Sequence, residues 1–313
     1  MLYRSSLELI GHTPLLELTH LNIANNNRIF AKLEFYNPAG GIKDRVALYI
    51  CQKLKEKGLL HKDSVIIEAT AGNTGLGIAF VAQHFGCKAI LIVPDKFSIE
   101  KQILMRALGA QVINTPKEKG MQGAMDRAQE MLSRTPYALS LNQFENLDNP
   151  QAHYLTTAKE IYDDMAKVQA NSENGSDALI DYLVCGAGSG GSFSGIVGYL
   201  KEQDSRIKGV LCDPVGSIIG GGEEGCANIE GIGNNFIPHT MDISLIDSVQ
   251  KITDEEAYEG VRMLAKNEGI LAGISSGACL IACLKLANEV QNSLIVTLFA
   301  DDLSRYFSRN LID

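Results

Sequence analysis

A lysine that follows two glycines stands at the start of a predicted helix, where a charged ammonium group is poorly placed. Residues 37–45 read Asn-Pro-Ala-Gly-Gly-Ile-Lys-Asp-Arg, and the proline and glycines predict a tight turn with exposed backbone. Apolar residues then recur at helical spacing, at Val46, Tyr49, Ile50 and Leu54. Lys43 is therefore expected at a helix N-terminus, where the helix dipole lowers the pKa of an ammonium group. A neutral lysine amine is the nucleophile of Schiff-base chemistry; the structural alternative is a solvated surface lysine.

A second polar loop covers residues 68–75, Glu-Ala-Thr-Ala-Gly-Asn-Thr-Gly, between a predicted strand and a predicted helix. In α/β folds, ligands bind at the carboxyl ends of parallel strands. The exposed amides and the hydroxyls of Thr70 and Thr74 suit a carboxylate, and Asn73 suits a phenolate-type oxygen. A helix cap with a tight turn would use the same residue types.

A glycine-rich loop at residues 185–192, Cys-Gly-Ala-Gly-Ser-Gly-Gly-Ser, also lies between a predicted strand and a predicted helix. Repeated glycines let backbone amides surround an anion, so the loop predicts a phosphate-binding cup. A dinucleotide site is the alternative, because Asp213 ends the next strand where a ribose-binding acid would lie. The glycine spacing departs from the dinucleotide fingerprint, and such a site would leave Lys43 without a role.

A fourth motif, Gly-Ile-Ser-Ser-Gly at residues 273–277, precedes an apolar helix expected from about Ala278. Alone, it is typical of a helix cap. Beside a cofactor, the Ser275 hydroxyl could face a ring nitrogen. A hydroxyl leaves a pyridine ring a weaker electron sink than a carboxylate would, which suits elimination and replacement at a β carbon.

The elements that position these motifs alternate along the chain. The predicted strands are 64–69, 88–93, 111–114, 179–185, 208–213 and 294–300. The predicted helices include 75–85, 98–108 and about 120–132, and a helix opened by a capping box of Thr253 and Glu256. This alternation predicts two α/β units with parallel sheets covered by helices on both faces. Residues 147–150 are the expected crossing between the units, and the polar residues 171–177 are an expected surface loop.

Composition excludes several classes of function. The chain has 313 residues and a net charge of −9, which argues against nucleic acids and anionic membranes as partners. Its seven cysteines lack metal-type spacing and predict free thiols in a reducing compartment, with no metal site. The N-terminus lacks an apolar signal region, and no apolar run reaches transmembrane length. We therefore expect a soluble, cytoplasmic protein.

In combination, these motifs resemble the cysteine synthase / cystathionine β-synthase family, the O-acetylserine sulfhydrylase-like pyridoxal 5′-phosphate (PLP) enzymes of fold type II. The resemblance extends from Ile-Gly-His-Thr-Pro-Leu at residues 10–15 to the helix after Ser275. It implies two doubly wound α/β domains with mostly parallel sheets, similar to tryptophan synthase β, with the active site between them. The implied smaller domain comprises residues 1–12 and 36–147 and carries the substrate carboxylate loop. The implied larger domain comprises residues 13–35 and 148–313 and carries the phosphate cup.

The resemblance implies a role for each matching residue. Lys43 binds the cofactor covalently and serves as the catalytic base, Asn73 contacts the ring hydroxyl, and Ser275 lies beside the ring nitrogen. The implied phosphate-binding residues are Gly188, Ser189, Gly190, Gly191 and Ser192. The implied substrate-binding residues are Thr70, Ala71, Gly72, Asn73, Thr74 and Gln143, with Gly231 in a lid loop at residues 230–233.

The implied reaction is β-replacement on O-acetylserine, serine or cysteine with a thiol or sulfide, through an aminoacrylate intermediate, giving cysteine or cystathionine. The alternative is an enzyme that consumes cysteine and releases hydrogen sulfide, leaving serine, lanthionine or cystathionine. A non-catalytic cofactor-binding relative is a third hypothesis, disfavoured by the intact set of Lys43, Asn73 and Ser275. The resemblance also implies a homodimer and, as a candidate partner, the C-terminal tail of serine acetyltransferase.

Three departures from the family pattern bear on the choice of substrate. Many relatives have serine where this chain has Gly41 and Ala71. Asn234 and Asn235 follow the lid loop, where some relatives carry an acid. The Thr-Ala-Gly-Asn form of the carboxylate loop resembles a bacterial branch whose members carry both family names. The sequence therefore leaves the second substrate open.

Overall fold

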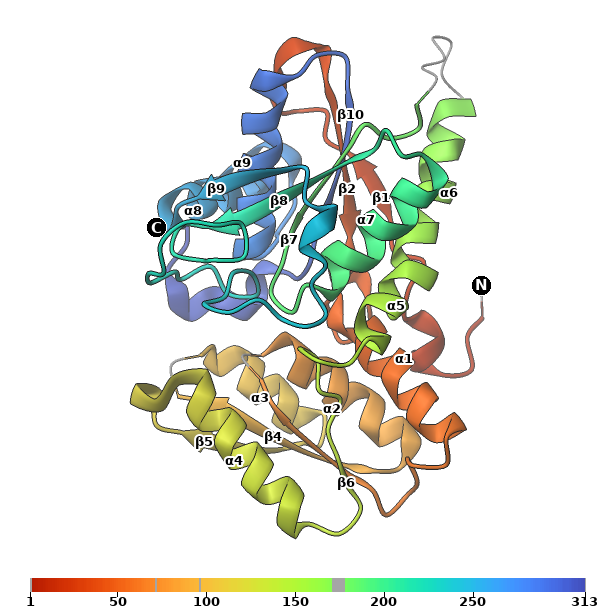
Figure 1. The fold of residues 1–313 in the computed structure, drawn as a ribbon, viewed down its shortest axis with the longest axis vertical. Coiled ribbons are helices and arrows are strands. Elements are labelled where there is room, and N and C mark those ends of the chain that lie inside the picture. Colours follow the sequence, from red (N-terminus) through yellow and green to blue (C-terminus); the bar gives the residue numbers. More distant parts are fainter. Residues whose placement is uncertain (1, 71, 96, 171–177, 313) are drawn as a thin grey trace.

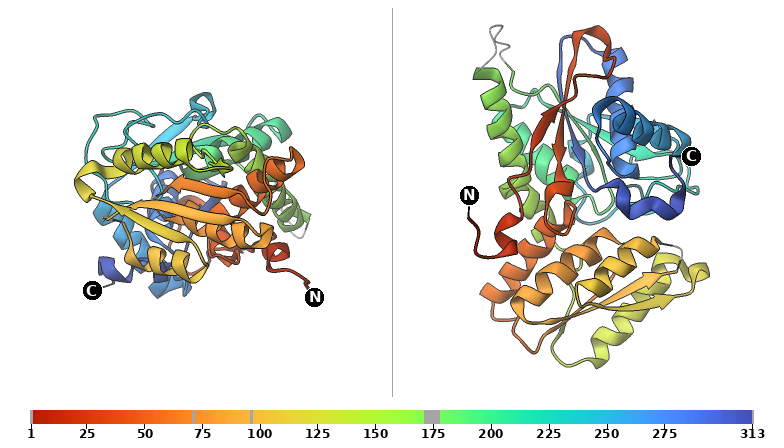
Figure 2. Two further views of the ribbon diagram at one scale, coloured as in Figure 1. Left: turned by 90° about the horizontal axis from the view of Figure 1, so that it is seen from below. Right: turned by 180° about the vertical axis from the view of Figure 1, so that it is seen from behind.

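Two β-sheets organise the chain, and Figure 1 shows them in two units, one above the other. The structure is a computed structural model, and it describes residues 2–70, 72–95, 97–170 and 178–312. The chain after β10 (Leu294–Phe299) returns to the boundary between the units. Its 3₁₀ helix, Leu303–Arg309, packs against α3 (Ile99–Ala107) of the other unit. The rear view in Figure 2 shows this last segment, in violet-blue, directly above the smaller unit.

Among the described residues, six strands form the larger sheet. In spatial order they are β1 (Leu15–Glu17), β2 (Arg28–Leu33), β10 (Leu294–Phe299), β7 (Tyr182–Gly186), β8 (Lys208–Pro214) and β9 (Ser248–Ile252). All neighbouring pairs are parallel except β1 and β2. Strand β10 is buried along its whole length, as expected of a central strand covered on both faces.

Helices cover both faces of the larger sheet. One face packs against α8 (Asp254–Met263) and α9 (Ile274–Glu289). The other packs against α6 (Thr157–Ala170) and α7 (Gly191–Gln203). The short helix α5 (Asp148–Leu155) joins this unit to the smaller one and contacts α1.

The smaller sheet contains, in the described part of the chain, four parallel strands. In spatial order they are β5 (Gln111–Thr115), β4 (Lys88–Pro94), β3 (Val65–Ala69) and β6 (Ala138–Leu139). One face packs against α1 (Lys43–Glu56), α2 (Asn73–Phe85) and Met105 of α3, and the other packs against α4 (Gly120–Arg134). The α/β class predicted from the sequence, with mostly parallel sheets, is therefore confirmed.

Most predicted elements lie within a few residues of their expected bounds, including the capping box of Thr253 and Glu256 and the Ser98 N-cap. The expected start of the last helix was wrong. Helix α9 begins at Ile274, so the Ser-Ser-Gly of the motif lies inside the helix. Gly277 there lets α9 pack closely against α8, since a Cβ would lie 2.3 Å from Ala257 O. The structure places Ser275 in the first turn of this helix.

Other expectations also need adjustment. The strand expected over 179–185 is β7, which begins only at Tyr182. The segment 147–150, the expected crossing between the units, lies at the start of α5. The expected surface loop at 171–177 lies outside the described residues. In the part of the chain that the structure describes, no helix is both long and apolar enough to span a membrane.

Candidate active site

Lys43 is the first residue of α1, at the boundary between the two units, as the glycine turn before it predicts. Its Nζ donates a hydrogen bond to Ser189 Oγ at 3.0 Å, which joins the smaller unit to the glycine-rich loop. Burial of the amine lowers the pKa of Lys43 from its usual 10.5 to about 8. The Lys43 pKa is therefore lowered, as the sequence predicts, but the main cause is desolvation of the amine rather than the helix dipole. Among the described residues, no carboxylate forms an ion pair with Lys43.

The residues around Lys43 in the 37–45 motif build the support for its helix. Asp44 Oδ2 accepts from the N–H of Ala39 at 2.7 Å and closes the turn. Burial raises the pKa of the Asp44 carboxyl to about 7, against the lowering effect of that hydrogen bond. Helix α2 lies directly against this turn, since a Cβ on Gly77 would be 2.7 Å from Lys43 O. Only glycine at position 77 allows this approach.

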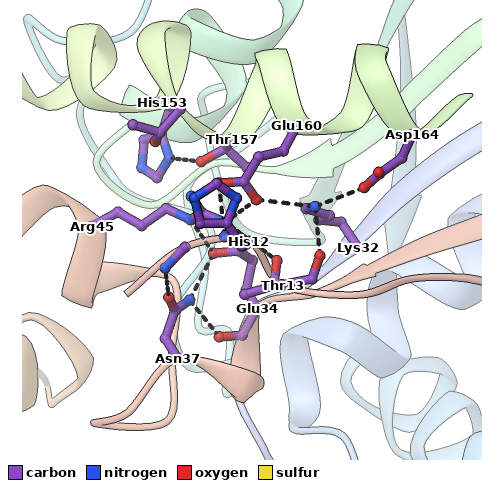
Figure 3. Close-up of polar contacts among 12 residues, drawn as sticks. His12, Thr13, Lys32, Glu34, Asn37, Arg45, His153, Thr157, Glu160 and Asp164 are labelled. Carbon is purple, nitrogen blue, oxygen red and sulfur yellow. Dashed lines mark hydrogen bonds and ion pairs between the residues drawn. The ribbon is translucent and has the colours of Figure 1, made fainter. Parts of the chain in front are cut away.

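Arg45 anchors α1 in a buried network of ion pairs shown in Figure 3. Its guanidinium donates to both carboxylate oxygens of Glu34, at 2.7 and 2.8 Å, and to both of Glu160, at 2.7 and 2.8 Å. Lys32 Nζ joins Glu160 at 3.1 Å, and Asn37 donates to Glu34 Oε2 at 2.9 Å. These contacts connect β2 and α6 to α1, the helix that begins at Lys43. They give Asn37 and Arg45 a structural role that the sequence did not reveal.

The loop after β3 is closed by its own hydroxyl groups. Thr70 Oγ1 accepts from the N–H groups of Gly72 and Gly75, at 3.0 and 3.1 Å, and so caps the start of α2. Thr74 Oγ1 donates to Gln143 Oε1 at 2.6 Å. The structure thus brings Gln143 to the loop, although 69 positions separate it from Thr74 in the sequence. Ala71, also expected to bind substrate, lies outside the described residues.

The glycine-rich loop connects β7 to the N-terminus of α7. Gly190 takes a left-handed conformation (φ 82°) at the N-cap position, which favours glycine. Ser189 is buried, and its Oγ accepts from both Lys43 Nζ and Asn149 Nδ2, at 3.0 and 2.9 Å. Gly191 leaves room for Asn149, because a Cβ there would be 2.1 Å from Asn149 Oδ1. The first amides of an α-helix have no intrahelical acceptor, and this is the property that the predicted phosphate cup would use.

Two further predicted residues lie on the larger-unit side. Ser275 is 3% exposed, in the first turn of α9. Gly231 faces it: a Cβ on Gly231 would be 3.9 Å from Ser275 Oγ. The backbone of Gly231 also covers the glycine-rich loop, since a Cβ on Gly188 would be 2.3 Å from Gly231 O. The expected lid loop therefore contacts the expected phosphate cup.

The residues present fit pyridoxal phosphate. They offer an amine with a lowered pKa, the N-terminal amides of a helix of 13 residues, and a buried serine hydroxyl, Ser275. Asn149 Oδ1 and Asp301 Oδ1 are buried and have no hydrogen-bond partner among the described residues, so these polar atoms are available at the boundary. The aldehyde, the phosphate and the ring nitrogen of the cofactor would each meet a group of suitable chemistry.

Sequence reasoning missed the contribution of the chain after β10. Asn73 Nδ2 donates to Asp301 Oδ2 at 2.7 Å, and Asn73 Oδ1 accepts from Arg305 Nη1 at 2.7 Å. Lys101, on α3, is buried and binds Glu230 and Tyr306. One signal was available: Asp301 directly follows a buried parallel strand, at the sheet edge where ligand sites form. Asn149 was also missed, and its segment was interpreted only as a crossing.

The fold and this site define a pyridoxal-phosphate-dependent enzyme. A family model described as "Pyridoxal-phosphate dependent enzyme" matches residues 7–301, and the chain belongs to this family. The chain is 42% identical over 307 residues to the O-acetylserine dependent cystathionine beta-synthase of Bacillus subtilis, covering 98% of this chain and 96% of that protein. It is 42% identical over 314 residues to a cysteine synthase of Helicobacter pylori, covering 99% of both.

The comparison with a solved structure also relates the chain to enzymes of sulfur metabolism. The hydrogen sulfide-producing enzyme of Fusobacterium nucleatum superposes with a TM-score of 0.91 at 38% identity, covering 98% of this chain and 100% of that chain. The chain is therefore a PLP-dependent enzyme of the cysteine synthase / cystathionine β-synthase type, as the motifs implied.

Proposed function

We propose that the protein catalyses β-replacement on O-acetylserine, serine or cysteine with a thiol or sulfide, giving cysteine or cystathionine. The observation that carries the proposal is the amine of Lys43, which has a lowered pKa and lies 3.0 Å from Ser189 Oγ of the glycine-rich loop. Pyridoxal phosphate, when bound, supplies an electron sink for negative charge at the substrate α carbon. The relatives named above act in the same chemical class.

Each residue has a stated task in this proposal. Residues 188–192 hold the phosphate with backbone amides and the Ser189 and Ser192 hydroxyls. Asn73 donates to the ring oxygen, and Ser275 faces the ring nitrogen. Lys43 attaches to the cofactor at rest, and its neutral amine takes the proton from the substrate α carbon and later returns it.

The substrate carboxylate is assigned to the loop after β3. Thr70, Ala71, Gly72, Asn73 and Thr74 supply amides and hydroxyls, with Gln143 beside them. Gly231, in the lid loop, excludes water from the reacting carbon. The hydrogen bond from Thr74 to Gln143 supports this assignment because it holds the two parts of the carboxylate site together.

A second candidate function uses the same residues. The similarity to a hydrogen sulfide-producing enzyme favours a reaction in which cysteine is the first substrate and sulfide is the leaving group. Incubation with cysteine alone separates the two functions: rapid sulfide release with serine or lanthionine as products supports the second. Faster turnover of O-acetylserine with sulfide or a thiol supports the first.

Assembly, location and domain division are also proposals. We infer that residues 1–12 with 36–147, and 13–35 with 148–313, form two domains, and the two separate sheets support this division. We also propose a homodimer, a cytoplasmic location and, as a candidate partner, the C-terminal tail of serine acetyltransferase. Its terminal carboxylate would suit the loop of Thr70 and Thr74. The seven free thiols, six of them buried, support a reducing compartment.

The decisive test is the visible spectrum of the purified protein, recorded before and after O-acetylserine and, separately, cysteine. A yellow protein whose spectrum changes with these substrates supports the proposal. A protein that stays colourless after pyridoxal phosphate is added contradicts it. Ser189→Ala and Ser192→Ala should mainly weaken cofactor retention, roughly tenfold for a lost hydrogen bond to a charged group. Ser194→Ala, two positions beyond the cup in α7, is the matched control.

A further inference from the structure

Arg305 lies in the C-terminal segment, residues 301–309, and contacts the turn before Lys43 and the loop that carries Asn73. Its Nη1 donates to Asn73 Oδ1 at 2.7 Å, and its Nη2 donates to Ala39 O in the turn before Lys43. Arg305 is only 2% exposed. A long cation is rarely buried to this degree unless fixed acceptors surround it.

The turn before Lys43 is shaped around this guanidinium. A Cβ on Gly40 would lie 2.6 Å from Arg305 Nη2, and a Cβ on Gly41 would lie 3.1 Å from Nη1. The backbone of the same turn pairs with the start of the C-terminal segment: Ile42 N donates to Ala300 O at 3.0 Å. The close approach gives a physical reason for glycine at position 41 in this chain.

Arg305 also fixes which way the Asn73 amide points. A guanidinium can only donate, so the Asn73 atom that it contacts must be the oxygen. The Asp301 carboxylate accepts from Asn73 Nδ2 at 2.7 Å, and Asp301 is itself held by the Tyr306 hydroxyl at 2.5 Å. An amide nitrogen carries two N–H groups, and one is used by Asp301. The second N–H remains for a ligand.

We propose that Arg305 is a positioning residue that orients the Asn73 amide so that its N–H faces the cofactor ring oxygen. The inference rests on the proposed function, in which Asn73 donates to that oxygen. Asp301 opposes rotation of the amide from the nitrogen side, and Arg305 opposes it from the oxygen side. Loss of the guanidinium removes the contact that holds the Asn73 oxygen away from the ring oxygen, so a rotated amide, which replaces a hydrogen bond with a repulsion, becomes more accessible. The distant C-terminal segment therefore sets the electronic environment of the cofactor.

The test compares Arg305→Gln and Arg305→Lys with the wild type, each reconstituted with pyridoxal phosphate. In Arg305→Gln we expect a displaced visible absorption band and a roughly tenfold lower affinity for the cofactor. The reason is the loss of the charge-assisted hydrogen bond that orients the Asn73 amide. Arg305→Lys keeps the charge, but one ammonium group lacks the planar fork that serves Ala39 O and Asn73 Oδ1 together. It should keep its fold and still show the displaced band; a wild-type spectrum and affinity in Arg305→Lys would overturn the proposal.

The same substitution in an Asn73→Ala variant separates a positioning role of Arg305 from a general contribution to stability. In Asn73→Ala, replacing Arg305 with Gln should change cofactor affinity by less than about twofold, because coupled residues are not additive. An equal loss in both backgrounds would overturn the proposal. Arg262→Gln is the matched control, because Arg262 also binds the C-terminal chain, at Leu311 O (3.2 Å), and it should leave the absorption band unchanged.

The experiments distinguish failure of the proposed function from failure of the role proposed for Arg305. If the wild-type protein binds no pyridoxal phosphate, the assignment of Lys43 fails before any Arg305 variant is made. If the wild type binds it and Asn73→Ala has a wild-type spectrum, only the role of Asn73, and with it that of Arg305, is overturned.

Discussion

At the scale of single residues, the reactivity of Lys43 is set by its burial. With a pKa of about 8 instead of 10.5, roughly a fifth of its amine is neutral near physiological pH, whereas a solvated lysine is almost entirely charged. We expect the cofactor-free protein to capture pyridoxal phosphate at a rate that rises roughly tenfold per pH unit and levels off above about pH 8. Stopped-flow absorbance measures this rate. Lys53→Ala, on the same helix, should keep the profile; an inflection near pH 10.5 would contradict the lowered pKa.

The same burial has a cost for the cofactor-free protein. Between about pH 8 and 10.5 the unfolded chain holds the Lys43 proton and the folded chain does not, so stability should rise with pH across that window. Below it, the charged amine destabilises the fold by up to about 3 kcal/mol. Lys43→Met should therefore stabilise the cofactor-free protein at neutral pH and remove the rise. Urea unfolding at several pH values tests this, and a less stable Lys43→Met variant at neutral pH would disprove it.

At the scale of elements, the close contact between α1 and α2 fixes the position of Lys43 at the start of α1. A Cβ on Gly77 would be 2.7 Å from Lys43 O, so Gly77→Ala must push the helices apart. We expect a loss of about 1–3 kcal/mol of unfolding free energy, together with weaker cofactor binding. Gly198→Ala is the control, since its Cβ would meet only Leu245 Cδ1, at 3.8 Å, and should stabilise α7 by roughly 0.5–1 kcal/mol. Equal effects of the two substitutions on calorimetric stability would argue against this account.

The ion pairs of Arg45 with Glu34 and Glu160 lead to a separate prediction about the stability of the protein in acid. Burial alone would raise the pKa of Glu160, but the Arg45 hydrogen bonds and charge lower it from 4.5 to about 2. Its contribution is therefore complete above pH 4.5 and is lost as the pH falls toward 2. Glu160→Gln should cost about 3 kcal/mol at neutral pH, by leaving buried cations underpaired. Asp164→Asn, a more exposed partner of Lys32, should cost under about 1 kcal/mol.

The measurement is the free energy of unfolding of both variants and the wild type from neutral pH to pH 2. The difference between wild type and Glu160→Gln should shrink across the acid window. A difference that stays constant down to pH 2 would show that charge pairing is not its source.

Elements and motifs differ in how far the sequence reveals them. The strands β3, β4 and β8 and the loops that follow β3 and β7 were predictable, because apolar runs and glycine turns are local signals. The short strands β1 and β6 were not, since tertiary pairing alone defines them. The contact between Arg305 and Asn73 joins positions 232 residues apart, and no local pattern encodes it. Likewise, the ion pair of Arg45 and Glu160 joins positions 115 residues apart, on α1 and α6.

At the scale of the whole molecule, the site exists only where the two units meet. Lys43 belongs to a helix that packs on the smaller sheet, and Ser189 belongs to the loop between β7 and α7 of the larger sheet. Their 3.0 Å hydrogen bond crosses the boundary, and the C-terminal segment crosses it again through Arg305 and Asn73. A cofactor held by the amine on one side and the phosphate on the other would add a third connection.

Cofactor binding should therefore protect both units together. At a free concentration of about 100 times Kd, pyridoxal phosphate should add about 2.7 kcal/mol to the free energy of unfolding. Hydrogen–deuterium exchange should slow in peptides that cover residues 37–45 and, equally, in peptides that cover 188–192. In Lys43→Ala the phosphate can still bind the glycine-rich loop, so protection should persist at 188–192 and decline at 37–45. Loss of protection on both sides in that variant would mean that the amine, rather than the cup, provides most of the binding energy.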